Sequence, residues 1–320
     1  SHRPTARLNL LASAEQELNR SLGFEVPRPL LKWITGLDEA EDLWRRMSDT
    51  PGPSVFDRAL AAIPAEYRCL EQDLERVPKE GPVVVVSNHP FGLLDGLILG
   101  SLMRRRRADF RILANSILAS VPEINQHVIA VSVIARDAHV NGPALRSALR
   151  FLQAGGALVI FPAGEVSAPH GMPPAISDPE WNNRALRLAL AAKAPIVPVY
   201  VSGRNSAAFQ ISGLVHPMLR TALLSRELMN KRGQRVDVAV GHRIPVDKLA
   251  EAGPDRLAAY VRERTYLLGE RRVQSRPPLF RRPVAPQPVA PAQDSETLGA
   301  EIAALAPGAL LVRGGGYAVY

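Results

Sequence analysis

A histidine and an aspartate separated by five residues are the strongest chemical signal in this sequence. His89 follows a run of valines at 83–86, and Asp95 lies in an apolar, helix-like run that begins after Gly92. A carboxylate held against Nδ1 of an imidazole fixes its tautomer and leaves Nε2 free to accept a proton from a hydroxyl. The pair therefore predicts general base chemistry in the turn between a strand and a helix.

The residues around this pair favour that interpretation over a structural one. In isolation, His89 would more often be a core or capping side chain, and Asp95 a carboxylate that stabilises a helix start. Pro90 and Gly92, however, favour a sharp turn between the two. The start of the following helix would direct backbone N–H groups towards the space beside His89, where an oxyanion could sit.

A second loop with similar features follows the apolar run at 157–161. Its sequence, Phe-Pro-Ala-Gly-Glu-Val-Ser, occupies residues 161–167. Gly164 allows a ligand to approach the backbone closely, and the loop N–H groups together with Ser167 could bind an anionic or carbonyl group. Ligands of open α/β sheets bind at the carboxyl ends of the strands. Because both loops follow predicted strands, we expect them to form one site.

The elements that must position these loops alternate between β-branched runs and helix-like segments, which is typical of an α/β domain. The predicted strands cover residues 83–87, 110–113, 129–134, 157–161, 196–201 and 236–240. The predicted helices cover about 143–154, 181–193 and 255–271, and Pro143 is expected at the start of the first of them.

The composition and the pattern of apolar residues change along the chain and predict four parts. Residues 1–80 are expected to form an N-terminal helical arm, and residues 81–271 the α/β domain. Residues 272–296 are rich in proline and alanine and predict a linker. Residues 297–320 have a helix-then-strand pattern but are too few to bury a core, so we expect them to be the truncated start of a second domain.

Composition limits the class of protein and its partners. The chain has 320 residues, of which 39 are Lys or Arg and 31 are Asp or Glu, giving a net charge of +8. This charge favours a negatively charged partner, such as nucleic acid, anionic lipid or an acidic carrier protein. The single cysteine, Cys69, excludes an intramolecular disulfide framework. A spanning helix is not expected, because no apolar run reaches about 18 uncharged residues, and we predict a cytoplasmic protein.

The order of three motifs resembles the glycerolipid acyltransferase superfamily, the PlsC-like lysophospholipid acyltransferases. The motifs are Asn-His-Pro-Phe-Gly-Leu-Leu-Asp-Gly at 88–96, the loop at 161–167, and the apolar Ile-Val-Pro-Val-Tyr-Val at 196–201. The sequence is most similar to the branch of hemolysin-like proteins and ornithine-lipid acyltransferases, over about residues 81–245. The resemblance implies a mixed, largely parallel sheet flanked by helices, with His89 and Asp95 as a catalytic dyad.

The resemblance also implies which residues contact substrate, and the sequence departs from the family pattern at three places. The family places four residues between the dyad members, but that position is Leu94 here, so only Asp95 can serve. Ala163 replaces the usual glutamate and Val166 the usual basic residue, which agrees with a lyso-aminolipid acceptor that carries a carboxylate rather than a phosphate. The implied substrate-binding residues are Asn88, Phe91, Gly92, Arg136, Phe161, Pro162, Gly164, Glu165 and Ser167.

The implied reaction transfers a fatty acyl group from a thioester on acyl carrier protein or coenzyme A to the free hydroxyl of a lysolipid. The lysolipid would be a lyso-ornithine or other lyso-aminolipid, or a lysophospholipid. Neither a metal nor a cofactor beyond the acyl donor is expected, and nucleic acid is not an expected partner. Two alternatives remain open: a noncatalytic module that binds lipid or acyl carrier and regulates the C-terminal domain, and a hydrolase of acyl thioesters.

Such an enzyme must meet its lipid, and three segments are candidates for peripheral attachment to the inner face of the cell membrane. The run Arg104 to Arg107 could bind anionic headgroups, although a solvated helix end is the plainer interpretation. Residues 30–37 and 214–230 combine apolar and basic side chains and could lie in a membrane interface, although core-facing helices are the commoner explanation of such spacing.

Overall fold

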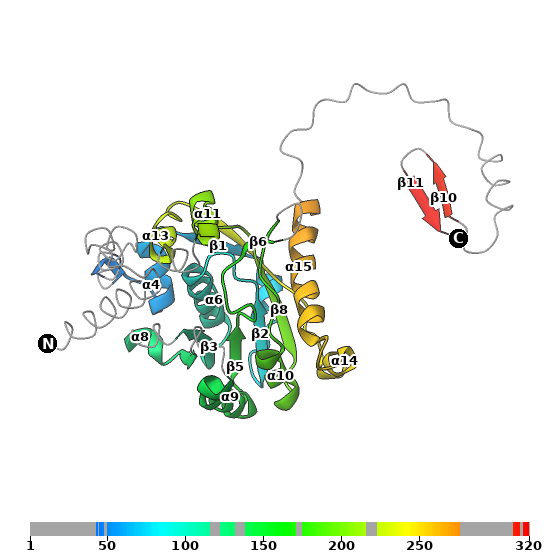
Figure 1. Cartoon of the computed structure of the whole chain (residues 1–320), viewed down its shortest axis with the longest axis horizontal. Coiled ribbons are helices and arrows are strands. Elements are labelled where there is room, and N and C mark those ends of the chain that lie inside the picture. The colour runs from blue at the N-terminus through cyan, green and yellow to red at the C-terminus, as the bar shows by residue number, and fades with distance from the viewer. Residues whose placement is uncertain are drawn as a thin grey trace, which may run out of the picture. The chain divides into compact units, whose positions relative to one another are not determined.

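The computed structural model divides the chain into two compact units, Ser1–Ser275 and Arg276–Tyr320. It describes residues 43, 45–47, 50–115, 122–131, 138–170, 175–215, 223–275, 310–313 and 316–319. The first unit holds both predicted loops and is shown in Figure 1. Within the described parts of the chain, no helix has the length and apolar character needed to cross a membrane.

A seven-stranded sheet forms the centre of the first unit, in the order β1-β9-β8-β2-β5-β3-β4. Strands β8, β2, β5, β3 and β4 pair in parallel, whereas β9 runs antiparallel to β8, and β1 pairs in parallel with β9. The expected mixed, largely parallel sheet is therefore confirmed. The strands are β1 (Glu66–Cys69), β2 (Val83–Ser87), β3 (Phe110–Asn115), β4 (Val128–Val131), β5 (Ala157–Ile160), β8 (Ile196–Val201) and β9 (Arg235–Val240).

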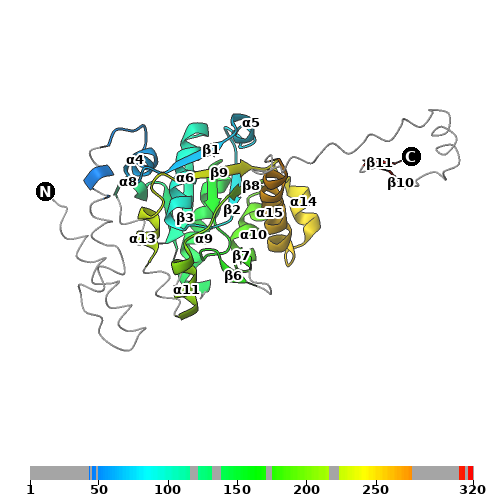
Figure 2. The ribbon, with the colours of Figure 1, turned by 90° about the horizontal axis from the view of Figure 1, so that it is seen from above.

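Helices cover both faces of this sheet, as Figures 1 and 2 show. Val83 and Val85 of β2 face one apolar cluster, and Val84 and Val86 face the other. Successive side chains of a strand point to opposite faces, so a strand buried on both faces must be apolar throughout. The first face carries α4 (Val55–Ala62) and α6 (Leu93–Arg106), and the second carries α9 (Ala138–Gln153), α10 (Asn183–Ala191), α14 (Val246–Ala252) and α15 (Leu257–Ser275).

Shorter elements surround the sheet. They are α5 (Glu71–Leu74), α8 (Pro122–Asn125), α11 (Ala207–Val215), α13 (Leu224–Met229) and the antiparallel pair β6 (Ala168–His170) and β7 (Ala175–Ser177). Each of the six predicted strands has its counterpart among the described residues. The helix expected from Pro143 begins earlier, at Ala138, and contains this proline. Proline removes one helical hydrogen bond, but the buried Ala148 and Leu152 anchor the rest of the helix.

The predicted boundary after residue 80 is wrong, because residues before it belong to the sheet domain. Strand β1 adds to the edge of the sheet beside β9, and α4 packs on α6. The ring of Phe56 lies where a Cβ on Gly100 of α6 would stand, so these two helices approach closely. Strand β1 was not predicted from the sequence, because its four residues alternate between exposed and half-buried and contain no β-branched run.

The end of the domain also differs from the prediction. Helix α15 continues to Ser275, so the domain extends beyond the predicted end at residue 271. The remaining part of the predicted linker, 276–296, lies outside the described residues. In the second unit, the structure describes an antiparallel hairpin of β10 (Leu310–Arg313) and β11 (Gly316–Val319). Residues 297–309, where a helix was expected, also lie outside the described residues.

Candidate active site

His89 and Asp95 lie on either side of the short connection between β2 and α6, at the carboxyl edge of the parallel strands. Nδ1 of His89 is 2.9 Å from Oδ2 of Asp95. This distance allows an ionic contact, although the approach falls outside the geometry of a linear hydrogen bond. Catalytic hydrogen bonds in ligand-free sites are often poorly aligned and tighten when substrate binds. The structure thus brings together the two side chains that the sequence singled out.

A turn at Gly92 explains how Asp95 reaches His89 although five residues lie between them. Gly92 has φ 87°, in the left-handed region that other residues rarely adopt. A Cβ at this position would lie 2.9 Å from Leu224 and 3.2 Å from Val166, so the turn also requires the absence of a side chain. Leu94, at the usual family position, points into the core instead. Asp95 at the third position of α6 is the residue that reaches the imidazole.

Asp95 is fully buried and is held by its own turn. Its Oδ2 accepts hydrogen bonds from the backbone N–H groups of Phe91 and Gly92, both at 2.9 Å. Within the described residues, its Oδ1 has no hydrogen-bond partner. Burial raises the pKa of Asp95, and His89 and the two N–H groups oppose this rise. A carboxylate in this environment gains most from a positive charge beside it, which an imidazolium at His89 would provide.

The N–H groups of the turn just before α6 serve the carboxylate. Those of Phe91 and Gly92 point to Asp95 and not to a space for an oxyanion. They stabilise the carboxylate of the dyad, because hydrogen bonds to an ionised acceptor are stronger than those to a neutral one. The expectation that N–H groups at the start of the helix itself face such a space stays a prediction.

The second loop lies beside the first, as predicted. The ring of Phe161 stacks on the imidazole of His89, with 4.2 Å between centroids and 26° between planes. The N–H of Ser167 donates to the carbonyl of His89 at 2.9 Å. The side chain of His89 remains 19% exposed, so the ring has one covered face and still reaches the surface. An imidazole that must take a proton from a bound substrate needs this partial access.

The remaining residues of the second loop differ in their exposure. Pro162 and Ser167 are buried, whereas Gly164 and Glu165 are exposed. Gly164 has φ 66°, and the space around its Cα is open. The hydroxyl of Ser167 donates to the carboxylate of Asp178 at 2.6 Å. The substrate-binding roles implied for these four residues stay predictions.

The other predicted binding residues lie mostly inside the protein. The side-chain amide of Asn88 exchanges two hydrogen bonds with the backbone of Val201, at 2.8 and 2.7 Å, and so joins the ends of β2 and β8. Phe91 is buried, and Lys231 lies 5.0 Å from its ring centroid. Arg136 lies outside the described residues. Roles for these residues in contacting substrate likewise stay predictions.

Comparison with known proteins identifies the class of enzyme. Residues 16–273 match the model of a family described as Acyltransferase. The chain belongs to this acyltransferase family. The expected membership of the PlsC-like acyltransferase superfamily is confirmed, and with it the prediction of an enzyme.

Two relatives and one solved structure illustrate the similarity. The chain is 27% identical over 247 residues to a lyso-glycine lipid O-acyltransferase of Bacteroides thetaiotaomicron, covering 74% of this chain and 88% of that protein. It is 25% identical over 250 residues to a protein of the same name from Phocaeicola vulgatus, covering 74% and 86%. The crystal structure of PlsC, the 1-acyl-sn-glycerophosphate acyltransferase of Thermotoga maritima, aligns with a TM-score of 0.43 and 19% identity, covering 81% of this chain and 87% of that one.

The arginine run of this acyltransferase lies at the opposite edge of the sheet from the dyad. Arg107 donates to the carbonyls of Gly81 and Gly155, which precede β2 and β5. Arg105 pairs with Glu71 at 2.6 Å, and Arg106 donates to Val77. The structure therefore favours a helix end over a headgroup site, but this end is solvated only in part: Arg104 and Arg105 are exposed, whereas Arg107 is buried among internal contacts.

Asp178 contacts both loops of the site, although it was not among the residues predicted from the sequence. Its carboxylate accepts hydrogen bonds from the N–H of His89 at 3.1 Å and from the hydroxyl of Ser167 at 2.6 Å. In the sequence it belongs to no recognisable motif. The only local signal is Trp181, three residues on, whose indole N–H donates to the same carboxylate at 2.9 Å.

Proposed function

We propose that this acyltransferase moves a fatty acyl group from a thioester to the free hydroxyl of a lysolipid, with His89 as the general base. The observation that carries the proposal is the 2.9 Å contact between a partly exposed imidazole and a buried carboxylate at the carboxyl edge of the sheet. It is supported by the names of two relatives, both lyso-glycine lipid O-acyltransferases.

In the proposed reaction, the acceptor hydroxyl oxygen attacks the thioester carbon while Nε2 of His89 takes the hydroxyl proton. Asp95 stabilises the resulting imidazolium through Nδ1. The tetrahedral intermediate then collapses, the carbon–sulfur bond breaks, and His89 returns the proton to the leaving sulfur. A well-placed general base contributes about 10²- to 10⁴-fold to such a reaction. The products are the acylated lipid and the free thiol of the carrier.

A lyso-aminolipid is the acceptor class that we favour over a lysophospholipid. The two relatives are named for a lyso-glycine lipid, an acceptor of this class. Val166 stands where the family pattern has a basic residue, and it is 8% exposed and lies beside Gly92. A buried valine cannot neutralise a phosphate, so a headgroup without phosphate suits this loop better. Ornithine and glycine headgroups both meet that description.

A thioester-release assay tests the proposal and its alternatives. The purified enzyme is given acyl carrier protein or coenzyme A thioesters, with lyso-glycine lipid, lyso-ornithine lipid, lysophosphatidic acid or no acceptor. We expect thiol release that depends on a lyso-aminolipid, and the preferred thioester identifies the donor. Faster release with lysophosphatidic acid would overturn the acceptor class. Equal release without acceptor would support the hydrolase, and no release with any combination would support the noncatalytic module.

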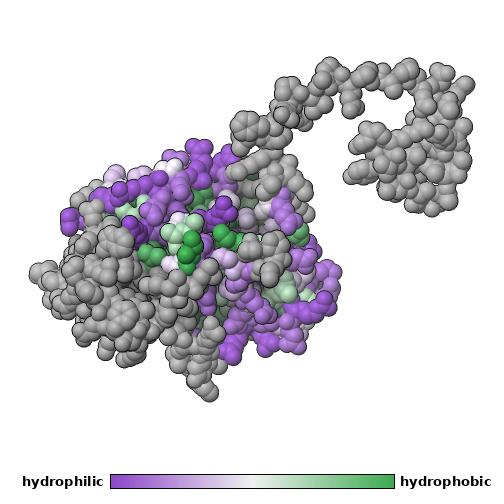
Figure 3. All heavy atoms as spheres, turned by 45° about the horizontal axis from the view of Figure 1, so that its top comes forward, coloured by the Kyte–Doolittle hydropathy of each residue, from purple (hydrophilic) through white to green (hydrophobic). Residues whose placement is uncertain are grey.

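The lipid acceptor also requires contact with a membrane, and α11 is the element that we place there. The side chain of Asn205, just before this helix, donates to the carbonyl of Phe91 in the dyad turn at 3.4 Å. The nine residues of α11 include no charged side chain, and Ile211 is 59% exposed. Figure 3 shows apolar side chains gathered on this face among hydrophilic ones. Exposed apolar groups beside a basic residue, here Arg204, suit an anionic bilayer surface.

This assignment replaces the arginine run as the proposed membrane contact, because the arginine run lies at the other edge of the sheet. Residues 30–37 and 216–222 lie outside the described residues. Since the thioester donors are soluble and the acceptor resides in a bilayer, we place the enzyme on the cytoplasmic face of the cell membrane, peripherally attached.

Flotation with vesicles tests the attachment. We expect the wild-type protein to float with vesicles that contain phosphatidylglycerol and to float less with phosphatidylcholine alone. Ile211→Asp should reduce flotation, because it places a charge on the exposed apolar face. Leu70→Asp is the matched control: Leu70 is 48% exposed and adjoins α5, away from the dyad turn. Equal loss in both variants, or no flotation of the wild type, would reject α11 as the contact.

A further inference from the structure

A buried carboxylate outside both motifs connects the two loops of the site. Asp178 is 2% exposed. Its Oδ1 accepts from the N–H of His89 and from the hydroxyl of Ser167, and its Oδ2 accepts from the indole N–H of Trp181. Both oxygens are therefore used by donors from separate parts of the chain.

The hydrogen bonds of Asp178 close a ring between the two loops. Oδ1 joins the N–H of His89 to the hydroxyl of Ser167, and the N–H of Ser167 returns to the carbonyl of His89 at 2.9 Å. This ring fixes the backbone on both sides of the imidazole relative to the second loop. A shift of the carboxylate would move the N–H of His89, and with it the side chain that must meet both Asp95 and substrate.

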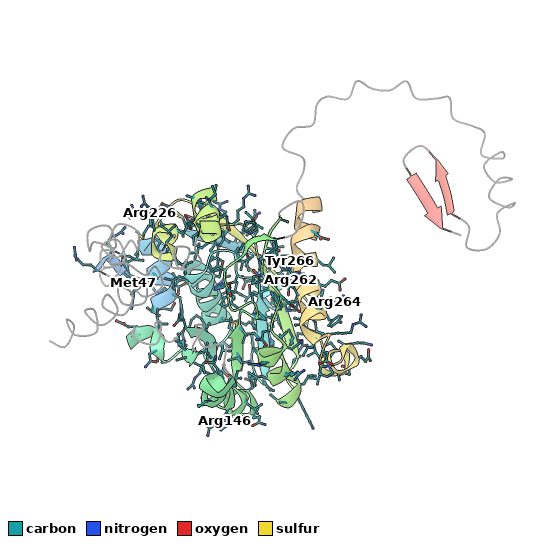
Figure 4. The ribbon with its side chains drawn as sticks, viewed as in Figure 1. Met47, Arg146, Arg226, Arg262, Arg264 and Tyr266 are labelled. Carbon is teal, nitrogen blue, oxygen red and sulfur yellow. The ribbon has the colours of Figure 1, made fainter. Side chains whose placement is uncertain are left out.

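The backbone of Asp178 is anchored in turn to α15. Its N–H donates to the hydroxyl of Tyr266 at 2.8 Å, and its carbonyl accepts from Arg262 at 3.0 Å. Figure 4 shows Tyr266 and Arg262 on the side of α15 that faces the sheet, with Arg264 pointing away. Helix α15 packs on β8, the neighbour of β2. The carboxylate is thus held on a rigid element rather than on the loop alone.

From these contacts we infer that Asp178 is a positioning residue for acyl transfer, which orients His89 and the 161–167 loop as one unit. It does not touch the reacting atoms; it acts through the backbone of His89 and through Ser167. Misplacement of a catalytic group by about 1 Å can cost about 100-fold in rate, so a small displacement would have a large effect. The inference rests on the proposed function and adds a residue that no motif of the sequence indicates.

Asp178→Asn is the decisive variant because it keeps the shape and removes one acceptor. If the amide oxygen takes the place of Oδ1, the amide nitrogen faces the indole N–H of Trp181, and two donors oppose each other. We expect the single-turnover rate to fall about 100-fold, while KM for donor and acceptor changes by less than about threefold. A purely structural role would lower the folded fraction and leave the rate per folded molecule unchanged.

A second substitution should rescue the first. Trp181→Phe removes the indole N–H that opposes the amide, so the double variant Asp178→Asn/Trp181→Phe should regain about tenfold in rate over Asp178→Asn. Trp181→Phe alone should lose activity, because it leaves Oδ2 of a buried carboxylate without its donor. A double variant no faster than Asp178→Asn would overturn the inference that the carboxylate acts by positioning.

A buried carboxylate outside the site provides the matched control. Asp237 on β9 is 6% exposed and pairs with Arg68 at 3.0 Å. Asp237→Asn should reduce thermal stability and leave the rate per folded molecule within about twofold of wild type. Equal rate losses in Asp178→Asn and Asp237→Asn would show that any buried carboxylate has this effect, and would reject the inference.

Hydrogen exchange separates failure of this inference from failure of the proposed function. Asp178→Asn should speed amide exchange at His89 and Ser167, a measurement that requires no substrate. If the wild-type protein transfers no acyl group but exchange increases as expected, the proposed function fails and the structural link stands. If transfer occurs and the variant changes neither its rate nor the exchange, the positioning role fails alone.

Discussion

Each end of helix α6 carries a buried charged side chain, and the two side chains differ in how completely their hydrogen bonds are satisfied. Asp95 in the first turn has an oxygen without a hydrogen-bond partner among the described residues, and burial raises its pKa. Arg107, just after the last turn, is also buried but pairs with both oxygens of Asp109 and donates to three carbonyls. Each charge has the sign that favours its end of the helix dipole.

The difference indicates where the protein keeps a buried charge with incomplete hydrogen bonding. At the carboxyl edge of the sheet, an incompletely satisfied carboxylate is kept beside an imidazole, where it can stabilise a developing positive charge. At the amino edge, Arg107 joins the segments that lead into β2, β3 and β5, so the charge stabilises the fold. Substitutions at the first end should therefore affect activity, and those at the second end stability.

The largest expected effect is on activity, from His89→Ala. Removing the proposed general base should lower the rate of acyl transfer by about 10⁴-fold, because among the described residues no other ionisable side chain pairs with Asp95. The variant should remain folded, since the imidazole is partly exposed and its backbone hydrogen bonds are retained. Thioester release with lyso-aminolipid and circular dichroism measure the two. A rate within tenfold of wild type would exclude His89 as the base.

Asp95→Asn should have the next largest effect on activity. The amide can still accept the two N–H groups of the turn, but it cannot stabilise an imidazolium by charge. We expect a loss of about 10²- to 10³-fold in rate, measured with saturating donor and acceptor. Asp95→Glu, which keeps the charge but lengthens the side chain, is the companion variant. A rate for Asp95→Asn near that of wild type would contradict the dyad.

Arg107→Met should instead reduce stability. The variant leaves the carbonyls of Pro78, Gly81 and Gly155 without this donor, at a cost of about 3 kcal/mol in the free energy of unfolding. Urea unfolding measures this loss, and the rate of transfer per folded molecule should not change. A loss of activity without a loss of stability would remove the contrast between the two ends of α6.

The pH dependence of stability sharpens the same contrast. Because burial raises the pKa of Asp95 above its usual 3.8, the native state holds this proton more tightly than the unfolded chain does. The contribution of Asp95 to stability is therefore fully present below pH 3.8 and is lost as pH rises through the raised pKa. Asp95→Asn has no such proton to lose.

We thus expect the difference in free energy of unfolding, Asp95→Asn minus wild type, to increase as pH rises from below 3.8 towards neutrality. Urea unfolding at a series of pH values measures it, and Asp237→Asn provides the comparison at a carboxylate paired with arginine. A difference that stayed constant, or decreased with pH, would contradict the raised pKa.

The smallest expected effect comes from Arg104→Met, at an exposed position of the arginine run. It should change the free energy of unfolding by no more than about 0.5 kcal/mol and leave the rate of transfer unchanged. Comparison with Arg107→Met separates the effect of buried hydrogen bonds from that of positive charge in general. Reduced flotation with anionic vesicles would show that the amino edge also contacts the membrane, contrary to the assignment of α11.

The sequence by itself determined the main strands, the two loops and the contact between His89 and Asp95. These features depend on short stretches of chain: four successive valines predict a strand buried on both faces, and a strand, a glycine turn and a helix start bring residues 89 and 95 together. The spacing of apolar residues and the positions of turn-forming residues are properties of short segments, so they can be recognised in the sequence.

Only the tertiary structure decided the rest. The bonds from Asp178 to His89 and to Tyr266 span 89 and 88 residues, and the contacts of Arg107 with Gly81 and Gly155 span 26 and 48. Strand β1 likewise exists because β9, far along the chain, offers a free edge. Partners at such separations meet only when the sheet and its helices pack, and no spacing in the sequence records which polar groups that packing will bury together.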